Sequence, residues 1–415
     1  MNLAAVTLIS SRLIIVDPGH FHATLLQKEM YPQLDPHVAV YAPLGPELLD
    51  YLNRVAVFNR RSDNPTHWQL DIHTSSDPMA AVIRDKPGNI IVFSGRNSGK
   101  IDNIIASLNS GLHVLADKPW IITAAEFPKL EQALDLAASK KLAAYDIMTE
   151  RFEVTSQLQR ELVNSSIVFG ELLKGSPTQP AITARSVHHI MKNVAGLPLR
   201  RPTWFFDIAD YGDGLADVGT HPVDLVQWIA FPDQLLDYRK DIDILSSRRE
   251  ALTITRDQYK RVTGADLPGS TPTLDYACNR YIEYTLRGAH VKLDVLWNWE
   301  APAGKGDTYD AAFHGSRATI ELRNDDVYVV PTKDPAAVFA ALEALVAKWQ
   351  SRWPGIAVKK NGSEAKLLIP AQFRVSHEDH FGQVAKKFLE YVENPTSLPA
   401  WERAYMLTKY YVTTH

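Results

Sequence analysis

Short apolar runs alternate with segments of helical periodicity over the first 150 residues of the chain. The runs read LIIV, HVAVYA, NIIVF, HVLA and LAAY. The segments between them, including FHATLLQKEM, PELLDYLNRV, KIDNIIASLN and AAEFPKLEQALDLAASKK, favour helices. Short buried strands that alternate with helices are typical of a parallel sheet covered on both faces. We therefore expect an α/β domain with a doubly wound parallel sheet over residues 1–150.

From residue 151 onward the pattern changes to strands and turns with fewer helices. RYIEYTLRGAHVKLDVLWNWE predicts a hairpin that turns at Arg287 and Gly288, and YDAAFHGSRATIELR predicts a second that turns at Gly315 and Ser316. Helices are predicted for DVGTHPVDLVQWIA, for a polar segment within an expected insertion at 331–370, and for 376–415. Residues 151–415 are therefore expected to form an α+β domain with a mostly antiparallel open sheet. Its roles would be substrate binding and self-association into a homo-oligomer, a dimer or tetramer.

Composition and charge narrow the function. The chain has 415 residues, 45% of them hydrophobic and 22% charged, with a net charge of −4 and both signs interspersed. This balance provides no basic field for nucleic acid or an anionic membrane. The single cysteine, Cys278, excludes an internal disulfide and a multi-cysteine metal site. The stretch MNLAAVTLIS lacks the basic region of a signal peptide, and no apolar run approaches the roughly 18 residues of a membrane helix, so we expect a cytoplasmic protein.

Polar tails follow three of the predicted parallel strands, with the sequences VDPGHFH, FSGRNS and ADKPW. Because ligands bind beyond the carboxyl ends of such strands, the tails are expected to meet at one site. The last tail places Lys118 directly after its strand, where an ammonium group can donate to a substrate oxygen and burial can lower its pKa. A surface lysine before a proline turn is the alternative interpretation.

The first tail has the position of a phosphate-binding loop without its usual glycines. Aligned with G-x-G-x-x-G, Asp17 takes the place of the first glycine, Gly19 keeps the second, and His22 takes the third. Gly19 would let the backbone approach a pyrophosphate, and His22 should crowd the helix against the strand. The charge of Asp17 is unfavourable there unless it caps backbone amides. The segment is interpreted as an altered cofactor loop or, alternatively, as a strand that only meets a helix.

The motif DVGTHPVDLVQW spaces Asp217, His221 and Asp224 at i, i+4 and i+7, which would place them on one helix face. A carboxylate one turn from a histidine can orient the ring and raise its pKa, as suits a general base near neutrality. The alternative is a helix start that Asp217 caps, with His221 half-buried.

Two further clusters are candidates for contacts with an oxygen-rich ligand. In RSVHHIMK an extended backbone would place His188 and Lys192 on one face and His189 on the other. In NWEAPAGKGD, Trp297 and Trp299 share a strand face, which suits a sugar ring or, equally, a packed sheet.

The segment SHEDHF offers His377, Glu378 and His380. The two histidines are i, i+3 on a helix and would make a metal pair. Because the sequence shows no third ligand, polar residues at a helix start are the favoured interpretation, and no metal is expected.

Three motifs together resemble one family. The stretch GLHVLADKPW matches G-x-H-V-x-x-E-K-P from Gly111 to Pro119, with Asp117 in place of glutamate. Asp217, Gly219, His221 and Asp224 match D-x-G-x-H-x-x-D in full, and FHGSRATIELR resembles a glycine turn of the C-terminal sheet. In these residues, and over about residues 12–325, the chain resembles the Gfo/Idh/MocA oxidoreductases.

The resemblance implies a Rossmann-type first domain, a nicotinamide cofactor and a sugar, sugar derivative or cyclitol as substrate. It implies that Lys118 hydrogen-bonds the reacting oxygen, that His221 takes or gives the proton, and that Asp217 orients His221 or binds an adjacent hydroxyl. Glu47 lies too late to be the usual acid on the adenine ribose, so NAD and NADP both stay open.

The expected cofactor-binding residues lie in the three strand tails: Asp17, Gly19, His20, Phe21, Ser94, Gly95, Arg96, Asp117 and Lys118. The expected substrate-binding residues lie in the second domain: His188, His189, Lys192, Trp204 and Asp224.

Three other functions fit the same residues. One is an enzyme that holds its nicotinamide tightly and uses a transient ketone for glycoside cleavage or epimerisation. Another is a sugar-binding or regulatory protein without a cofactor, which the altered loop favours and the intact set of Lys118, Asp217 and His221 disfavours. The third is a metal-dependent isomerase or lyase built on the SHEDHF histidines.

Overall fold

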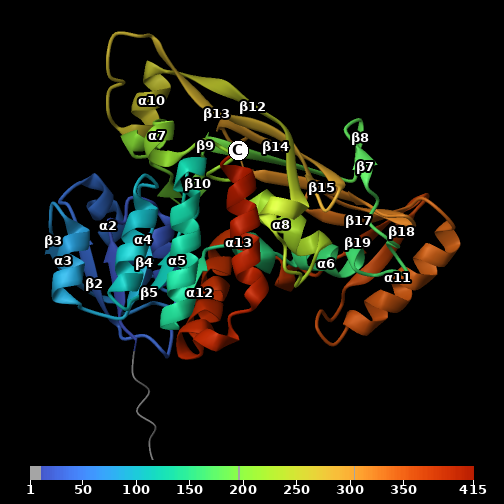
Figure 1. The fold of residues 1–415 in the computed structure, drawn as a ribbon, viewed down its shortest axis with the longest axis horizontal. Helices are drawn as coiled ribbons and strands as arrows, with labels where there is room; N and C mark the ends of the chain where they lie inside the picture. Colours follow the sequence, from blue (N-terminus) through green and yellow to red (C-terminus); the bar gives the residue numbers. More distant parts are fainter. Residues whose placement is uncertain (1–10, 195–196, 303) are drawn as a thin grey trace, which may run out of the picture. The chain divides into compact units, whose positions relative to one another are not determined.

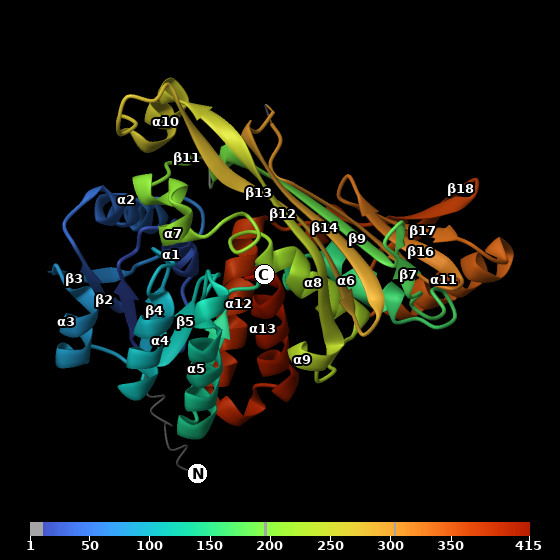
Figure 2. The same ribbon diagram turned by 45° about the horizontal axis from the view of Figure 1, so that its top comes forward.

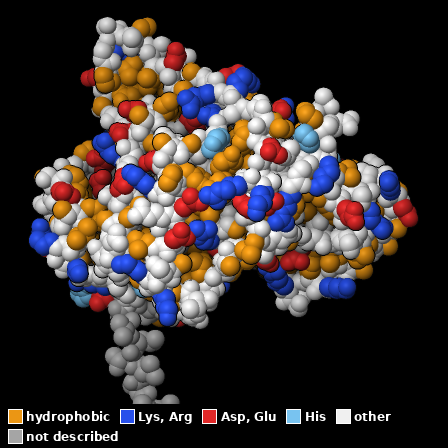
Figure 3. Space-filling model, in the orientation of Figure 1, with side chains coloured by type: hydrophobic (Ala, Val, Ile, Leu, Met, Phe, Trp, Pro, Cys, Tyr) orange, Lys and Arg blue, Asp and Glu red, His pale blue; other side chains and the backbone are white. Residues whose placement is uncertain are grey.

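The computed structural model describes residues 11–194, 197–302 and 304–415, and its contacts divide the chain into two units (Figure 1). The first unit comprises the residues up to Ile121 together with Ala125–Ile147 and Phe381–Pro399. The second comprises Ile122–Ala124, Met148–His380 and Ala400–His415. No helix in the described ranges is both long and apolar enough to cross a membrane. Acidic and basic side chains both occur across the face in Figure 3, as the small net charge predicts.

The first unit contains a six-stranded sheet in the order β3-β2-β1-β4-β5-β6, with every neighbouring pair parallel. Its central strands are uniformly buried because helices cover both faces, which explains their continuous apolar runs. The predicted doubly wound sheet is confirmed. The strands are β1 (Leu13–Val16), β2 (His37–Ala42), β3 (Gln69–Thr74), β4 (Ile90–Phe93), β5 (His113–Ala116) and β6 (Ala144–Asp146).

The helices of the first unit follow the strands along the chain (Figure 2). Helix α4 packs on α5, and α1 on α2. Strand β3 escaped prediction because it is an edge strand whose side chains are mostly exposed and polar. Helix α3, which follows it, was also not predicted. The helices are α1 (His22–Leu25), α2 (Pro46–Arg60), α3 (Pro78–Asp85), α4 (Lys100–Asn109) and α5 (Phe127–Lys140).

The helix predicted over FHATLLQKEM is wrong in length. Only one α-helical turn forms, and it continues as a 3₁₀ turn, Leu26–Lys28, before the chain becomes extended. The carbonyl oxygen of Gln27 accepts from Trp68 Nε1 at 2.8 Å, and that of Lys28 accepts from Arg61 at 2.5 Å. Side chains from distant segments thus take the carbonyls that a longer helix would use.

The second unit contains a nine-stranded sheet in the order β12-β13-β14-β9-β15-β16-β17-β19-β18. All neighbours are antiparallel except β14 and β9, so the mostly antiparallel sheet is confirmed. The strands are β9 (Ile182–Met191), β12 (Ile242–Thr255), β13 (Thr273–Leu286), β14 (Ala289–Glu300), β15 (Thr308–His314), β16 (Ala318–Arg323), β17 (Asp326–Pro331), β18 (Ala357–Asn361) and β19 (Glu364–Leu368). Two small antiparallel sheets pair β7 (Gly175–Ser176) with β8 (Gln179–Pro180) and β10 (Asn193–Val194) with β11 (Leu197–Pro198).

Both predicted hairpins form. Leu286 pairs with Ala289, and the two turn residues between them, Arg287 and Gly288, have φ of 50° and 75°. Positive φ at both positions is the requirement of a tight turn that matches the strand twist. The second hairpin closes where Gly315 N donates to Ala318 O at 3.0 Å.

Helices α6 and α8 of the second unit pack on this sheet, α6 against β16 and β17 and α8 against β9. The segment 331–370 forms α11 and also the hairpin β18–β19, which extends the sheet and was not predicted. Its strands are short, and β18 carries exposed lysines, as expected of a sheet edge. The helices are α6 (Val154–Val163), α7 (Ile208–Tyr211), α8 (Thr220–Ala230), α9 (Tyr238–Asp241), α10 (Arg256–Thr263), α11 (Pro335–Trp349), α12 (His377–Glu393) and α13 (Ala400–Thr413).

The helices at the end of the chain form where they were expected, but residues 381–399 belong to the first unit rather than to 151–415. The ring of Phe381 lies 4.6 Å from that of His22, and the ring of Tyr391 lies 5.3 Å from that of Tyr145. These are contacts between the two ends of the chain, which local sequence patterns do not reveal.

Candidate functional site

The polar tails after β1, β4 and β5 lie in contact, as predicted for the carboxyl ends of parallel strands. His20 N donates to Ser94 O at 3.0 Å, and Asp117 N donates to Phe93 O at 2.8 Å. Ser94 Oγ lies 3.4 Å from Asp117 Oδ2. Hydrogen bonds between the tails therefore hold them at one edge of the first unit's sheet.

Asp17 adopts the backbone conformation that a glycine would favour at the first position of the loop, with φ of 44°. Its carbonyl oxygen accepts from Gly19 N at 2.7 Å. Gly95 lies so close that a Cβ there would be 2.4 Å from this oxygen, which explains the glycine after β4. Burial raises the pKa of the Asp17 carboxyl, against the opposing charge of Arg96.

The Asp117 carboxylate joins two histidines of the first tail. Its Oδ2 lies 2.9 Å from Nδ1 of both His20 and His22. Burial lowers the pKa of His22 well below its usual value, so we assign the His22 ring as a neutral Nδ1–H donor to Asp117. Asp117 Oδ1 is buried and has no hydrogen-bond partner in the described structure. An amide or hydroxyl donor of a ligand would satisfy this oxygen.

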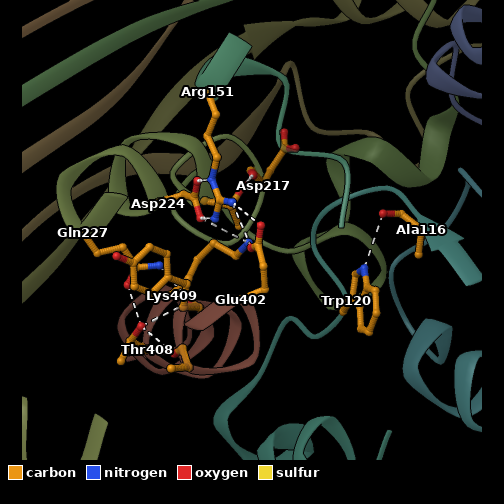
Figure 4. Close-up of polar contacts among 12 residues, drawn as sticks. Ala116, Trp120, Arg151, Asp217, Asp224, Gln227, Glu402, Thr408 and Lys409 are labelled. Carbon is orange, nitrogen blue, oxygen red and sulfur yellow. Dashed lines mark hydrogen bonds and ion pairs between the residues drawn. The ribbon is translucent and has the colours of Figure 1, made fainter. Parts of the chain in front are cut away.

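Lys118 follows Asp117 directly and is 4% exposed. The next turn is anchored by Trp120, which is fully buried and whose Nε1 lies 3.4 Å from Ala116 O (Figure 4). A second buried lysine, Lys100 at the start of α4, donates to Asp117 O at 3.0 Å and to Asn97 Oδ1 at 2.6 Å. Sequence reasoning missed Lys100, although it lies just after the FSGRNS tail that it stabilises.

The other expected cofactor-binding residues sit in the same tails. Phe21 packs its ring 4.5 Å from His22, and Arg96 is exposed just after Gly95. The backbone amides of Gly19 and His20 are already used within the unit. His22 replaces the third glycine at the start of an α1 that is a single turn long, so the loop lacks a long helix behind it.

The second unit holds His221 on α8, but Asp217 lies before that helix. Helix α8 begins at Thr220, and Asp217 belongs to the preceding turn, where Tyr211 Oη donates to its Oδ1 at 3.1 Å. The predicted arrangement of Asp217, His221 and Asp224 on one helix face is therefore wrong. Only glycine fits at position 214 of this turn, because a Cβ there would be 2.0 Å from Cys278 O.

Asp224 is buried in an ion-pair network rather than available to a substrate (Figure 4). Arg151 donates to both of its oxygens at 2.6 and 2.7 Å, and Arg151 also donates to Glu402 at 2.9 Å. Lys409 Nζ lies 3.8 Å from Asp224 Oδ1. The motif's last aspartate thus joins the 3₁₀ turn Thr149–Phe152, α8 and α13.

His188, His189 and Lys192 converge on Asp307, a residue that the sequence did not single out. The Asp307 carboxylate lies 2.9 Å from His188 Nδ1 and 3.1 Å from His189 Nδ1, and it accepts from Lys192 Nζ. The prediction that His189 points away from the other two is therefore wrong. Burial alone would raise the pKa of Asp307, but the charges of His188 and Lys192 hold it well below its usual value.

The aromatic residues near this cluster are packed. Trp204 is 7% exposed and its ring lies 5.7 Å from that of Tyr211. Trp297 is 3% exposed and lies 5.4 Å from the His188 ring. For Trp297 the packed-sheet interpretation agrees with the structure.

The SHEDHF histidines meet a glutamate from elsewhere in the second unit. Donor atoms of Glu153, His377 and His380 all lie within 4.8 Å of one another. Glu378 is not part of this group. It follows His377 on the helix, and consecutive helical residues point about 100° apart. Glu150 is adjacent, and burial together with the Glu153 carboxylate raises its pKa to about 7.

Comparison with known proteins places these features in context. Residues 158–415 match a family model described as "Putative oxidoreductase C terminal domain". No curated protein matches the chain. A solved structure from Parabacteroides merdae, described as a "putative oxidoreductase", is 42% identical, with 98% of this chain and 96% of that chain covered and a TM-score of 0.94.

Two more distant structures share the fold. The 3-ketoreductase KijD10 from Actinomadura kijaniata, solved with NADP and TDP-benzene, is 13% identical, with 96% of this chain and 94% of that chain covered and a TM-score of 0.60. A biliverdin reductase from Synechocystis, solved with biliverdin and NADP+, is 11% identical, with 98% and 97% covered and a TM-score of 0.59.

Proposed function

The chain belongs to the Gfo/Idh/MocA family of oxidoreductases, and from that premise we propose that it uses NAD or NADP to oxidise or reduce a sugar, sugar derivative or cyclitol at a hydroxyl or carbonyl carbon. The cofactor would supply the hydride chemistry. The observation that carries the proposal is the cluster at the carboxyl edge of the first unit's sheet, with Asp117 at its centre and Lys118 beside it.

The residues of this edge fit a nicotinamide cofactor. Asp117 Oδ1 is a buried acceptor with no partner in the described structure, and the carboxamide of a nicotinamide is a donor that would satisfy it. Gly95 keeps the second tail free of a side chain next to the loop, and Arg96 offers an exposed cation for a diphosphate. Two distant structures of this fold contain NADP, which supports the same cofactor class here.

The chain's own residues would handle the proton. Lys118 would donate a hydrogen bond to the reacting oxygen, and His221 would take or give its proton. Asp217, whose Oδ1 already accepts from Tyr211, would position His221 or bind an adjacent hydroxyl. His188, His189 and Lys192 would present polar groups to the substrate, with Asp307 holding them in place.

The first experiment is a titration of the purified chain with NAD(H) and NADP(H), together with denaturation to release any retained cofactor. Saturable binding or released nicotinamide supports the proposal and leads to a screen of sugars and cyclitols. If neither is found, a sugar-binding protein without a cofactor becomes the better interpretation. Turnover of glycosides without net NADH would instead identify the enzyme with a tightly held nicotinamide.

Replacing Lys118 tests its proposed hydrogen bond to the reacting oxygen. Lys118→Ala should lower turnover by about 100-fold or more, the range of general acid–base contributions, while the fold is retained. Lys129→Ala is the matched control, because Lys129 is an exposed lysine paired with Asp102 at 2.7 Å. Turnover of Lys118→Ala equal to that of the control would contradict the assignment.

A further inference from the structure

Two imidazoles and a carboxylate meet in the second unit outside the residues assigned to hydride chemistry. Glu153 lies at the junction between the 3₁₀ turn Thr149–Phe152 and α6, while His377 and His380 lie in the first turn of α12. Each residue offers one donor atom, and the three atoms lie within 4.8 Å of one another. The group thus combines residues more than 200 positions apart in the sequence.

His380 is the member whose environment points to a missing ligand. Its side chain is 1% exposed, and neither ring nitrogen has a hydrogen-bond partner in the described structure. Its Nδ1 lies 3.1 Å from Glu153 Oε1, but without the direction of a hydrogen bond. A buried polar group left without hydrogen bonds destabilises the fold, so a ligand on one of these nitrogens would offset that penalty.

The dimensions of the group suit a metal ion. Donors at about 2.1 Å from a tetrahedral ion are about 3.4 Å from one another. The three donor atoms here lie within 4.8 Å of one another, and His380 Nδ1 lies 3.1 Å from Glu153 Oε1. His380 is fixed by burial, whereas the side chains of His377 and Glu153 are 41% and 29% exposed and can rotate toward it. Glu150 Oε1 lies 3.6 Å from His377 Nδ1, where a second carboxylate can orient the ring.

The donor types select the class of ion. Two imidazoles with one carboxylate suit zinc and related first-row divalent metals, whereas magnesium and calcium prefer oxygen ligands. We propose that Glu153, His377 and His380 form a binding site for a zinc-class divalent ion. Three protein ligands leave at least one coordination position for water or a substrate oxygen.

The first unit offers a rival group, His20, His22 and Asp117, whose donor atoms also lie within 4.8 Å of one another. There, both Nδ1 atoms already face the same oxygen, Asp117 Oδ2, at 2.9 Å, so these three donor atoms pair with one another without an ion. The experiment must therefore tell the two groups apart.

The test uses the full chain, stripped with a chelator and then dialysed against Zn²⁺, with bound metal measured by mass spectrometry. We expect one tightly bound zinc per chain and a raised melting temperature. His377→Ala and Glu153→Gln should weaken zinc binding by more than about 100-fold, beyond the cost of changing a residue that only orients a ligand. Because both side chains are partly exposed, these variants should keep the fold, which circular dichroism checks.

Two control variants complete the design. His67→Ala removes an exposed histidine and should leave zinc binding and the zinc-induced rise in melting temperature unchanged. His22→Ala disrupts the rival group and should also retain the zinc. The proposal is overturned if no stoichiometric zinc binds, or if zinc is lost in His22→Ala but kept in His377→Ala.

Discussion

At the residue scale, the Asp117 carboxylate connects two departures from the family's motifs. The motif has glutamate where this chain has aspartate, and the loop has a histidine, His22, where a third glycine is usual. Aspartate is one methylene shorter, and the room next to it is taken by the imidazoles of His20 and His22, both 2.9 Å from its Oδ2. The two substitutions therefore compensate each other, and Oδ1 still remains available to a ligand.

The buried His22 side chain predicts a pH dependence of the free energy of unfolding. Burial lowers the pKa of His22, so the unfolded chain binds its proton more readily than the folded one. The stabilising contribution is complete above the unfolded value, about 6.5, and is lost as the pH falls toward the folded value. The free energy of unfolding should therefore decrease below about pH 6.5, by at most about 1.4 kcal/mol per pH unit for this group.

Urea unfolding between pH 8 and pH 5 measures the effect. His22→Asn keeps a donor for Asp117 but cannot titrate, so its stability should depend less steeply on pH than that of the wild type. His113 and His314, whose pKa values burial also lowers, account for part of the remaining slope. His67→Asn, at an exposed position, should match the wild type. Equal slopes for His22→Asn and the wild type would show that His22 is not responsible.

At the scale of elements, Arg151 connects three segments of the second unit. It donates to Asp224 on α8 and to Glu402 on α13, and it extends from the 3₁₀ turn Thr149–Phe152 (Figure 4). Its guanidinium also lies 5.5 Å from the ring of Trp401. The opposing charge of Arg151 keeps the pKa of Asp224 below its usual value even though burial alone would raise it. Asp224 therefore orients the helix that carries His221 by pairing with Arg151.

Removal of the Arg151 guanidinium should lower the free energy of unfolding substantially. Arg151→Met leaves two buried carboxylates without their partner, and such a loss typically lowers the free energy of unfolding by about 3–5 kcal/mol. The control is Arg261→Met, which removes an exposed arginine that pairs with Glu300 at 2.6 Å and should cost less than about 1 kcal/mol. Denaturant unfolding of both variants makes the comparison. Similar losses in the two variants would mean that the buried network contributes no more than a surface pair.

At the scale of the whole molecule, the first unit is completed by a segment from near the end of the chain. Residues 381–399 carry buried side chains that include Phe381, Val384, Phe388 and Tyr391. Their contacts within the unit include the rings of His22 and Tyr145. The first unit is therefore not contained in residues 1–150.

A fragment of residues 1–150 should accordingly be less stable than the complete unit. Burial of a single large apolar side chain contributes about 1.5–3 kcal/mol, so loss of the segment should cost several such contributions. The matched control is the same fragment joined to residues 377–399 by a flexible glycine-serine linker. Chemical unfolding and dye binding to exposed apolar surface should show the linked form to be more stable. Equal stability of the two forms would mean that residues 381–399 add nothing to the first unit.

Local sequence patterns determined most of the parallel strands, a hairpin turn and the position of one candidate site residue. Apolar runs of four to six residues predicted five of the six parallel strands, because buried strands between helices leave few polar positions. The Arg287–Gly288 hairpin was predictable because glycine tolerates positive φ at no steric cost. The position of Lys118 after β5 also followed from sequence alone, since the residue after a parallel strand lies at the carboxyl edge of the sheet.

Only the tertiary structure decided which distant side chains meet. Asp307 lies beside His188 because β15 pairs with β9 in the register that places Thr308 opposite Val187, and no local pattern specifies that register. Glu153 reaches His377 and His380, and Arg151 reaches Glu402, through the packing of helices far apart in the chain. Periodicity reports which face of an element is buried, but the partner on that face depends on how all the elements pack.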